Sequence, residues 1–241
     1  MGHLKRLAMP ASWPLKVKGN IFAPKPRPGP HSVSRGMPLI LIVRDILHFA
    51  ENAREARKII FSGKLLVDGK VIREPNYTAG LFDSVSIPSA GMHFRLMPSS
   101  YGLKLAEIRE EDGKSKPCRV ESKKTLKGGR IQIGLHDGRA MLADNKISRL
   151  DTVVIEVPKQ KMIGHHKLEA GKNAIVIAGS NAGAEGTVKA VKSRKYMLEQ
   201  STVTLDADGK EVKTVKEYVM ALPPGMSHPT ALERKPRRSK P

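Results

Sequence analysis

A glycine-rich loop between two apolar runs constrains the fold of this chain more than any other feature of its sequence. The loop covers residues 178–186 and contains Gly179, Gly183 and Gly186. Apolar alternation on both sides predicts two β-strands, and glycine permits positive φ angles and close approach of another backbone. We therefore expect a hairpin whose loop either turns tightly or lies flat against a phosphate–sugar surface.

Basic residues follow the second run, and together with the loop they resemble the KOW motif of ribosomal and transcription-elongation proteins. This resemblance implies a small SH-three-like barrel, which we place at residues 171–222, and contact between the loop and RNA. The RNA-binding residues that it implies are Gly179, Ser180, Asn181, Gly183, Gly186, Lys189, Lys192 and Arg194. A tight hairpin loop without a ligand explains the glycine spacing alone about as well.

The net charge indicates a polyanionic partner. Lys and Arg number 43 against 23 Asp and Glu, which gives a net charge of +20. Such a charge repels itself on folding, whereas binding a polyanion releases counterions. Aromatic residues make up only 4% of the chain, which favours phosphate contact and shape recognition over stacking of successive bases. A membrane partner is not expected, because the longest apolar run, residues 38–43, is too short to cross a bilayer and no secretory signal precedes it.

Residues 1–38 form a basic, proline-rich segment without any Asp or Glu. Proline removes amide donors and favours extended backbone, so we expect an extended arm that is disordered in the free protein and becomes ordered only when it binds its partner. A purely solubilising tail is the alternative, but such a tail has little use for Trp13, Ile21 and Phe22. The arm cations that we expect to contact RNA are Lys5, Arg6, Lys16, Lys18, Lys25, Arg27 and Arg35.

Two helices, a hairpin and a strand are predicted within residues 39–93. Apolar residues recur at helical spacing from Leu39 to Ala50, and Asn52 can cap a second helix that ends at Gly63. One face of that second helix is apolar, and the other carries Arg54, Arg57 and Lys58. The hairpin spans residues 64–72 around an Asp-Gly turn, and residues 81–87 read as a strand.

This order of elements resembles the α-L-type RNA-binding domain of small-subunit ribosomal protein four, some pseudouridine synthases and tyrosyl-tRNA synthetases. The matching residues are Glu55–Arg57, Gly63, Val67–Val71 and Asp83–Ile87. Asn52 and Ala53 stand where those domains often have Ser-Arg or Thr-Arg, so one phosphate contact of such domains is missing. A solvated basic helix face gives the same pattern. The cations that we expect on RNA are Arg44, Arg54, Arg57, Lys58, Lys64 and Lys70.

The remaining segments complete a mostly β, α+β fold. Residues 94–170 are predicted to form a central β domain, with strands at 103–108, 118–120, 130–135 and 152–157 and turns at 112–113, 128–129 and 137–138. The barrel closes with apolar runs at 203–205 and 212–219 around an Asp-Gly turn at 208–209. Residues 223–241 are basic and proline-rich, so we expect a second extended terminus that meets a polyanion.

The sequence offers little support for catalysis or for a metal site. Arg149-Leu150-Asp151 resembles the signature that holds the catalytic aspartate of pseudouridine synthases, but the glycine that usually closes it is missing, and a strand-entry role for Asp151 explains it better. His165 and His166 are adjacent, without a ligand cluster around them, and are expected in a loop or as phosphate donors. Cys118, the single cysteine, is expected to be a buried or half-exposed strand residue. No nucleotide-binding loop and no Gly-x-Ser-x-Gly motif occurs, and no cofactor or small-molecule substrate is expected.

Taken together, the segments resemble the archaeal and eukaryotic type of small-subunit ribosomal protein four from end to end. Leu4–Pro10, Trp13 and Ile21–His31 resemble the N-terminus of that family. The resemblance implies a structural, non-catalytic constituent of the cytoplasmic small ribosomal subunit that binds ribosomal RNA beside neighbouring ribosomal proteins. Two alternatives remain, an RNA-modifying enzyme of the pseudouridine-synthase type and a free transcription or translation factor that uses the KOW-like barrel.

Overall fold

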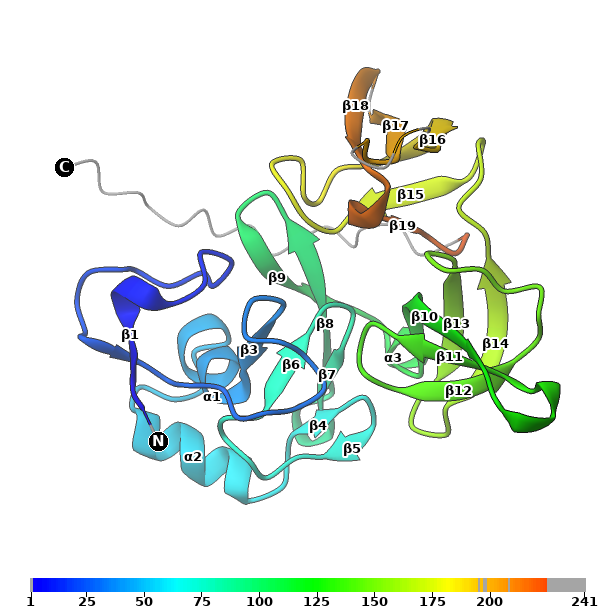
Figure 1. Cartoon of the computed structure of the whole chain (residues 1–241). Coiled ribbons are helices and arrows are strands. Elements are labelled where there is room, and N and C mark those ends of the chain that lie inside the picture. Colours follow the sequence, from blue (N-terminus) through cyan, green and yellow to red (C-terminus); the bar gives the residue numbers. More distant parts are fainter. Residues whose placement is uncertain (1, 195, 197–198, 208, 225–241) are drawn as a thin grey trace. The chain divides into compact units, whose positions relative to one another are not determined.

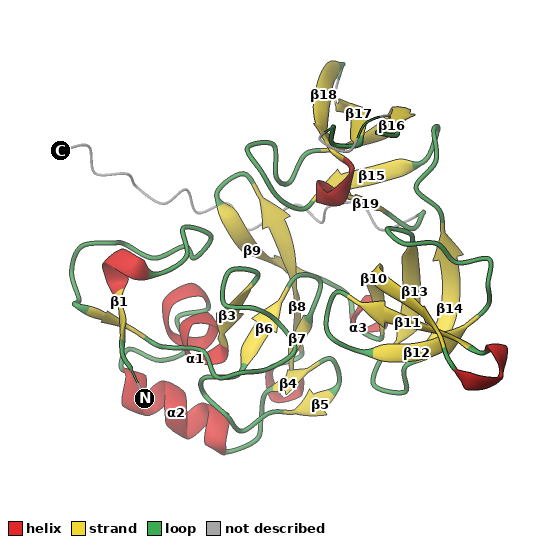
Figure 2. Cartoon of the chain, viewed as in Figure 1, coloured by secondary structure: helices red, strands yellow, loops and turns green. Residues whose placement is uncertain are grey.

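The computed structural model describes residues 2–194, 196, 199–207 and 209–224. These residues form two compact units (Figure 1). The first unit extends to Met97 and also includes Tyr101–Gly113, whereas the second contains Pro98–Ser100 and the chain from Lys114 onward. Strands predominate in both, and the longer helices belong to the first unit (Figure 2). The chain is therefore α+β and mostly β, as predicted.

A five-stranded sheet and two helices form the body of the first unit. The sheet has the order β5-β4-β7-β8-β9, and its strands are β4 (Leu66–Val67), β5 (Lys70–Val71), β7 (Ser84–Ile87), β8 (Met92–Ser99) and β9 (Gly102–Glu107). The other elements are β3 (Gly36–Pro38), which pairs with β6 (Thr78–Gly80), the helices α1 (Leu39–Leu41), η2 (Ile42–Ile46), α2 (Ala53–Phe61) and α3 (Glu110–Gly113), and the turn η3 (Pro88–Ala90).

The first predicted helix is shorter than its apolar pattern suggests. It begins at Leu39, and its last turn, η2, is π-helical. The chain takes a positive φ angle at His48, which is incompatible with a continuing helix, so Ala50 is buried outside it. The predicted strand at 81–87 likewise begins only at Ser84, because Phe82 also adopts a positive φ angle.

The sheet of the first unit continues beyond the domain boundary that we predicted at residue 93. β8 spans that position and pairs with β7, and β9 follows it in the same sheet. Alternation marks strands but not the sheet that they join, so the sequence did not indicate this continuation. The turn predicted at 112–113 is the end of the short helix α3. The five-part division of the chain stays a prediction.

The N-terminal arm is packed against the first unit. It contains β1 (Leu4–Lys5), η1 (Arg6–Ala8) and β2 (Phe22–Ala23), and β1 pairs with β2. Trp13 is 2% exposed, and its indole nitrogen donates a hydrogen bond of 2.8 Å to the carbonyl oxygen of Gly36. The arm has little regular structure, as its prolines predict. Its anchoring differs from our expectation of disorder, because Trp13 buries enough surface to hold it.

Two antiparallel sheets make up the second unit. The central sheet has the order β12-β11-β10-β13-β14, with β10 (Ser115–Thr125), η4 (Lys127–Gly129), β11 (Ile131–Leu135), β12 (Ala140–Ala143), β13 (Thr152–Glu156) and β14 (Lys161–His166). Its core includes Cys118, which is a fully buried strand residue in agreement with the prediction, with Val120, Ile133 and Val153.

The C-terminal sheet has the order β18-β17-β16-β15-β19. Its elements are β15 (Asn173–Val176), β16 (Glu185–Lys192), β17 (Thr202–Ala207), β18 (Lys210–Val215), η5 (Lys216–Tyr218) and β19 (Val219–Ala221). β19, the last of these strands in the chain, pairs with β15, the first. Side chains such as Val176, Val203 and Leu205 form a core. Gly209 has the positive φ angle of the predicted turn, whereas Asp208 and the tail from residue 225 lie outside the described residues.

Candidate nucleic-acid interface

Helix α2 brings three predicted RNA-binding cations together. Arg54, Arg57 and Lys58 are exposed, whereas Ala56 and Ile60, on the opposite face, are fully buried. The three cations form no ion pair within the described part of the chain, so their charge is available to a partner. Asn52 occupies the N-cap position in extended conformation, although its side chain makes no capping hydrogen bond. We call these three cations the α2 face.

The hairpin next to α2 is rigidly anchored. Asp68 and Gly69 both have positive φ angles, which gives the predicted tight turn between β4 and β5. Asp68 is buried, and its carboxylate accepts a hydrogen bond of 3.0 Å from the backbone nitrogen of Ser84. Lys64 and Lys70 are exposed on either side of this turn.

Among the arm cations, Arg6 and Arg27 make contacts within the fold. Arg6 is buried and donates a hydrogen bond of 2.6 Å to the backbone oxygen of Lys16, and Arg27 pairs with Glu74 at 2.8 Å. The other predicted arm cations, which are exposed, are Lys5, Lys16, Lys18, Lys25 and Arg35. In the adjoining helix, Arg44 pairs with Asp45 at 2.8 Å. Sequence spacing could not reveal the pair of Arg27, because Glu74 is far from it in the chain.

The glycines of the C-terminal loop differ in their roles. Gly179, Ser180 and Asn181 are exposed, so they are accessible to a ligand. Gly183 has a φ angle of +85°, and a Cβ there would lie 2.8 Å from the Cα of Ser99. A Cβ at Gly186 would collide with the backbone carbonyl of Asp206 on β17. The last two glycines therefore serve close packing in this structure, which the glycine spacing alone could not distinguish from RNA contact.

The cations that follow the loop pair with carboxylates. Lys189 lies 2.9 Å from Glu211 and 3.2 Å from Asp206, and hydrogen bonds to these two carboxylates raise its pKa. Lys192 pairs with Glu199 at 3.5 Å, and Arg194 is exposed. Ion pairs between exposed side chains stabilise a fold only weakly, so these cations can exchange their carboxylate partners for phosphate at little cost. Lys195 lies outside the described residues.

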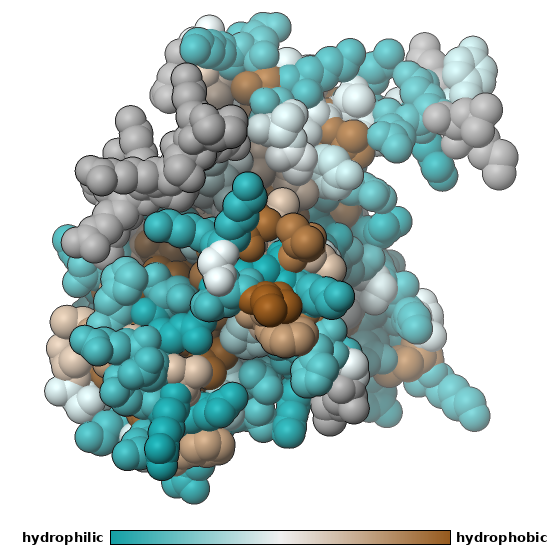
Figure 3. All heavy atoms as spheres, turned by 90° about the vertical axis from the view of Figure 1, so that its left-hand side faces the viewer, coloured by the Kyte–Doolittle hydropathy of each residue, from teal (hydrophilic) through white to brown (hydrophobic). Residues whose placement is uncertain are grey.

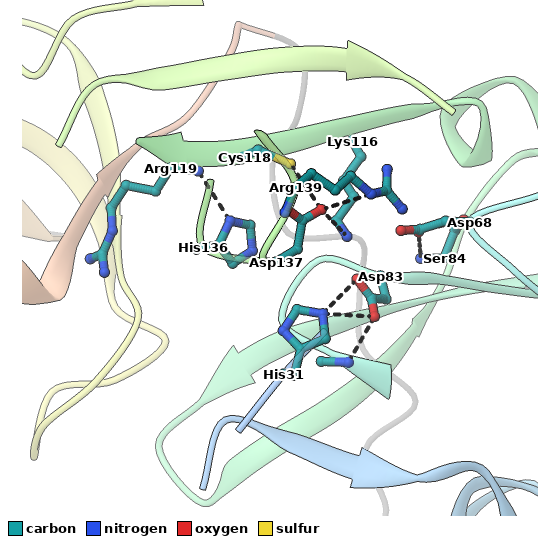
Figure 4. Close-up of polar contacts among 11 residues, drawn as sticks. His31, Asp68, Asp83, Ser84, Lys116, Cys118, Arg119, His136, Asp137 and Arg139 are labelled. Carbon is teal, nitrogen blue, oxygen red and sulfur yellow. Dashed lines mark hydrogen bonds and ion pairs between the residues drawn. The ribbon is translucent and has the colours of Figure 1, made fainter. Parts of the chain in front are cut away.

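Each unit contains a buried polar pair (Figure 4). In the first, the ring of His31 lies 3.0 Å from the carboxylate of Asp83, and both side chains are almost fully buried. In the second, Lys116 lies 3.0 Å from Asp137. Burial would raise the pKa of Asp137, but the charges of Lys116, His136 and Arg139 outweigh it, so the pKa lies below its ordinary value. Sequence reasoning missed these pairs, although Lys116 alternates with Cys118 and thus faces the core.

Asp151 has a structural role in this geometry. Its carboxylate accepts a hydrogen bond of 2.9 Å from the backbone nitrogen of Ser148 and lies 2.8 Å from the ring of His165 on β14. The two adjacent histidines lie in β14, so they are strand residues and not loop residues.

Burial, together with the charges of His165 and Lys172, lowers the pKa of His166. Arg119 also joins the two sheets of this unit, because it donates a hydrogen bond to the backbone oxygen of Glu217.

The described residues contain no group of three or more His, Cys, Asp and Glu side chains that could hold a metal ion. Within the same part of the chain, none of the helices has the length and apolar character needed to span a bilayer.

Comparisons with known proteins identify the family of this chain. Residues 2–34 match the RS4NT domain, residues 37–85 the S4 domain and residues 90–162 the ribosomal family S4e. The small ribosomal subunit protein eS4 of Aeropyrum pernix is 40% identical over 238 residues, which cover 94% of this chain and 93% of that relative. The chain belongs to the S4e family of ribosomal proteins.

Other members of the S4e family agree with this assignment. The small ribosomal subunit protein eS4 of Methanocella arvoryzae is 37% identical over 220 residues, which cover 91% of this chain and 93% of the relative. The crystal structure of the 30S ribosomal protein S4e from Thermoplasma acidophilum has a TM-score of 0.69 and 29% identity, and the match covers 78% of this chain and 95% of that one. The S4 match falls on the segment that holds the α2 face.

Proposed function

We propose that this protein is a structural constituent of the small ribosomal subunit in the cytoplasm, where it binds ribosomal RNA beside neighbouring ribosomal proteins and has no catalytic role. The proposal depends above all on the near full-length match to relatives named small ribosomal subunit protein eS4. The net charge of +20 and the available cations of the α2 face provide the physical means to bind RNA backbone.

The α2 face and the exposed start of the C-terminal loop are the proposed RNA contacts. Arg54, Arg57 and Lys58 project from a helix whose other side is packed, so they can meet phosphates without disturbing the core. Gly179, Ser180 and Asn181 are exposed at the loop, as a KOW-like RNA contact requires. The C-terminal sheet, whose last strand returns beside its first, supports an SH-three-like barrel at residues 171–222.

The α2 face can be tested by comparison with equally charged sites elsewhere. Replacing Arg57 and Lys58 with Ala should weaken binding of a small-subunit RNA fragment and reduce the slope of log affinity against log salt by roughly one for each phosphate that is no longer neutralised. Replacing the exposed residues Lys124 and Lys127 with Ala removes the same charge from the central sheet. Equal effects of the two double variants would show that only net charge matters and that RNA does not bind the α2 face.

The pseudouridine-synthase alternative has lost its main support. Asp151 is buried between a backbone amide and the ring of His165, and it lies within the segment that matches the ribosomal family. A free factor remains distinguishable by fractionation. A ribosomal constituent co-sediments with small subunits at one copy per subunit after a moderate salt wash. A factor is washed off or is present at less than one copy per subunit.

A further inference from the structure

The two-stranded ribbon of the arm has an outer face with an exposed aromatic ring. Lys5 lies directly opposite Phe22 in the antiparallel register, so their side chains share one face. The ring of His3 lies 5.3 Å from the ring of Phe22, on that same face. The neighbouring pair, Leu4 and Ala23, belongs to the other face, where Ala23 is buried. We name the outer face, formed by His3, Lys5 and Phe22, the arm platform.

Large apolar side chains around the platform are exposed to water. Phe22 is 53% exposed, and Ile21 and Leu7 are 72% and 85% exposed. A hydrogen bond of 2.9 Å from the Arg6 backbone nitrogen to the Ile21 carbonyl keeps the two ends of this segment together. On the side of the molecule that carries the arm, apolar side chains form a small patch among hydrophilic ones (Figure 3). A group of exposed apolar residues in one short segment marks a contact surface.

The positive charge around the platform indicates a ligand that carries phosphate. Residues 1–38 have no Asp or Glu, and the exposed cations Lys5, Lys16 and Lys18 lie close to the apolar residues in sequence. Duplex RNA presents phosphates but hides the faces of its bases, so it would leave Phe22 in water. An unstacked nucleotide presents a phosphate and an apolar base face together, which matches a cation beside an aromatic ring.

We propose that the arm platform binds an unstacked nucleotide of RNA, with its base stacked on Phe22 and its phosphate on Lys5. The proposal builds on the function proposed above and adds a second mode of contact to the α2 face. The low aromatic content of the chain excludes a run of stacked bases, but a single ring is enough for one base.

Binding of single-stranded and duplex RNA to the full chain separates the two modes. The probes are an oligouridylate of about 10 nucleotides and a blunt duplex of equal length. Phe22→Ala should weaken binding of the single strand roughly 5- to 100-fold and leave duplex binding unchanged. Tyr101→Ala, which removes an exposed ring from the β8–β9 turn, should change neither. Irradiated oligonucleotide with 5-iodouridine should cross-link to the peptide that contains Phe22.

A second variant distinguishes loss of the ring from loss of structure in the arm. Phe22→Tyr keeps the ring and should retain single-strand binding. Trp13 is the only tryptophan of the chain and is a buried residue of the arm, so its fluorescence reports whether each variant keeps the arm packed.

Three results would overturn the proposal in distinguishable ways. If Phe22→Ala binds the single strand as well as Tyr101→Ala does, the platform does not bind bases, although an effect of the Arg57 and Lys58 double variant would preserve the proposed function. If Phe22→Ala impairs incorporation into subunits but not single-strand binding, the platform contacts a protein. If the unaltered chain binds neither probe nor a small-subunit RNA fragment, the proposed RNA-binding function fails as well.

Discussion

Lys116 shows how one buried cation is accommodated in the central sheet. It is 1% exposed, and its partner Asp137 is 2% exposed. Asp137 also lies 3.3 Å from Arg139, and its other carboxylate oxygen accepts the backbone N–H of Arg139. The loss of one member of a buried pair leaves the other charged in a medium that solvates it poorly, so such pairs are far more sensitive to substitution than surface pairs.

Asp137→Asn should lower the free energy of unfolding by about 3–5 kcal/mol at neutral pH. The folded-state pKa of Asp137 lies below its ordinary value of 3.8, so the charged carboxylate stabilises the fold above that pH and the contribution is lost as the pH falls through the folded pKa. The difference between the two proteins in urea unfolding should therefore shrink below about pH 4. As a control, Glu156→Gln breaks an exposed pair with Lys159 and should cost less than about 1 kcal/mol.

A comparison of Gly183 with Gly128 separates two reasons for a glycine, the positive φ angle and the lack of space for a side chain. Gly183 and Gly128 have φ angles of +85° and +80°, but a Cβ at Gly128 meets nothing within 4 Å. Gly128→Ala should therefore cost only the backbone strain, about 1–2 kcal/mol. Gly183→Ala should cost about 1–3 kcal/mol more, because the methyl group contacts the Ser99 backbone. Equal losses in thermal unfolding would mean that the loop yields and that close packing is unimportant there.

At the scale of elements, the arm is attached by a buried pair as well as by Trp13. The His31 ring pairs with Asp83, and a Cβ at Gly80 would overlap that ring. The carboxylate of Asp83 also accepts a hydrogen bond of 2.9 Å from the Gly80 nitrogen, so the turn that pairs with His31 is itself held in shape.

His31→Ala should release the arm without unfolding the rest of the first unit. We expect Trp13 fluorescence to shift toward the red and a protease to remove the segment before residue 36 faster than from the unaltered protein. Ser32→Ala changes an exposed neighbour and should alter neither readout. An arm that stays protected in His31→Ala would show that its other contacts, such as those of Trp13 and the Arg27–Glu74 pair, are enough to hold it.

The sequence predicted those elements whose signal is local. The α2 face, the Asp68–Gly69 turn and most strands of the second unit follow from periodicity and turn residues that lie close together in the chain. Pairing between distant segments carries no such signal. The anchoring of the arm by His31 and the use of Gly183 in packing both depend on residues far apart in sequence.

For the candidate site, the residue types predicted which side chains are charged, but not which of them form ion pairs within the protein. Arg54 and Lys189 look alike in the sequence, yet only Lys189 has Glu211 and Asp206 beside it. The strand register that places those carboxylates depends on a bulge between Val188 and Ala190, which apolar alternation does not reveal.

At the scale of the whole molecule, the charge of +20 controls how binding depends on salt. If the protein makes about 6–10 phosphate contacts, its affinity for a small-subunit RNA fragment should fall roughly 10³–10⁵-fold between 50 and 200 mM salt. Filter binding across a salt series measures this slope. An affinity that hardly changes with salt would contradict a mainly electrostatic interface.

The pairing of β15 with β19 has a consequence for how the chain is made. A polypeptide leaves its ribosome from the N-terminus, so the sheet of the first unit has all its strands once Glu107 has emerged. The C-terminal sheet must wait, because Val219–Ala221 is the neighbour that completes β15. Until then, Ile175 and Val176 expose an open sheet edge and apolar surface. A nascent chain arrested before Val219 is therefore a vulnerable species, with a finished first unit and an aggregation-prone end.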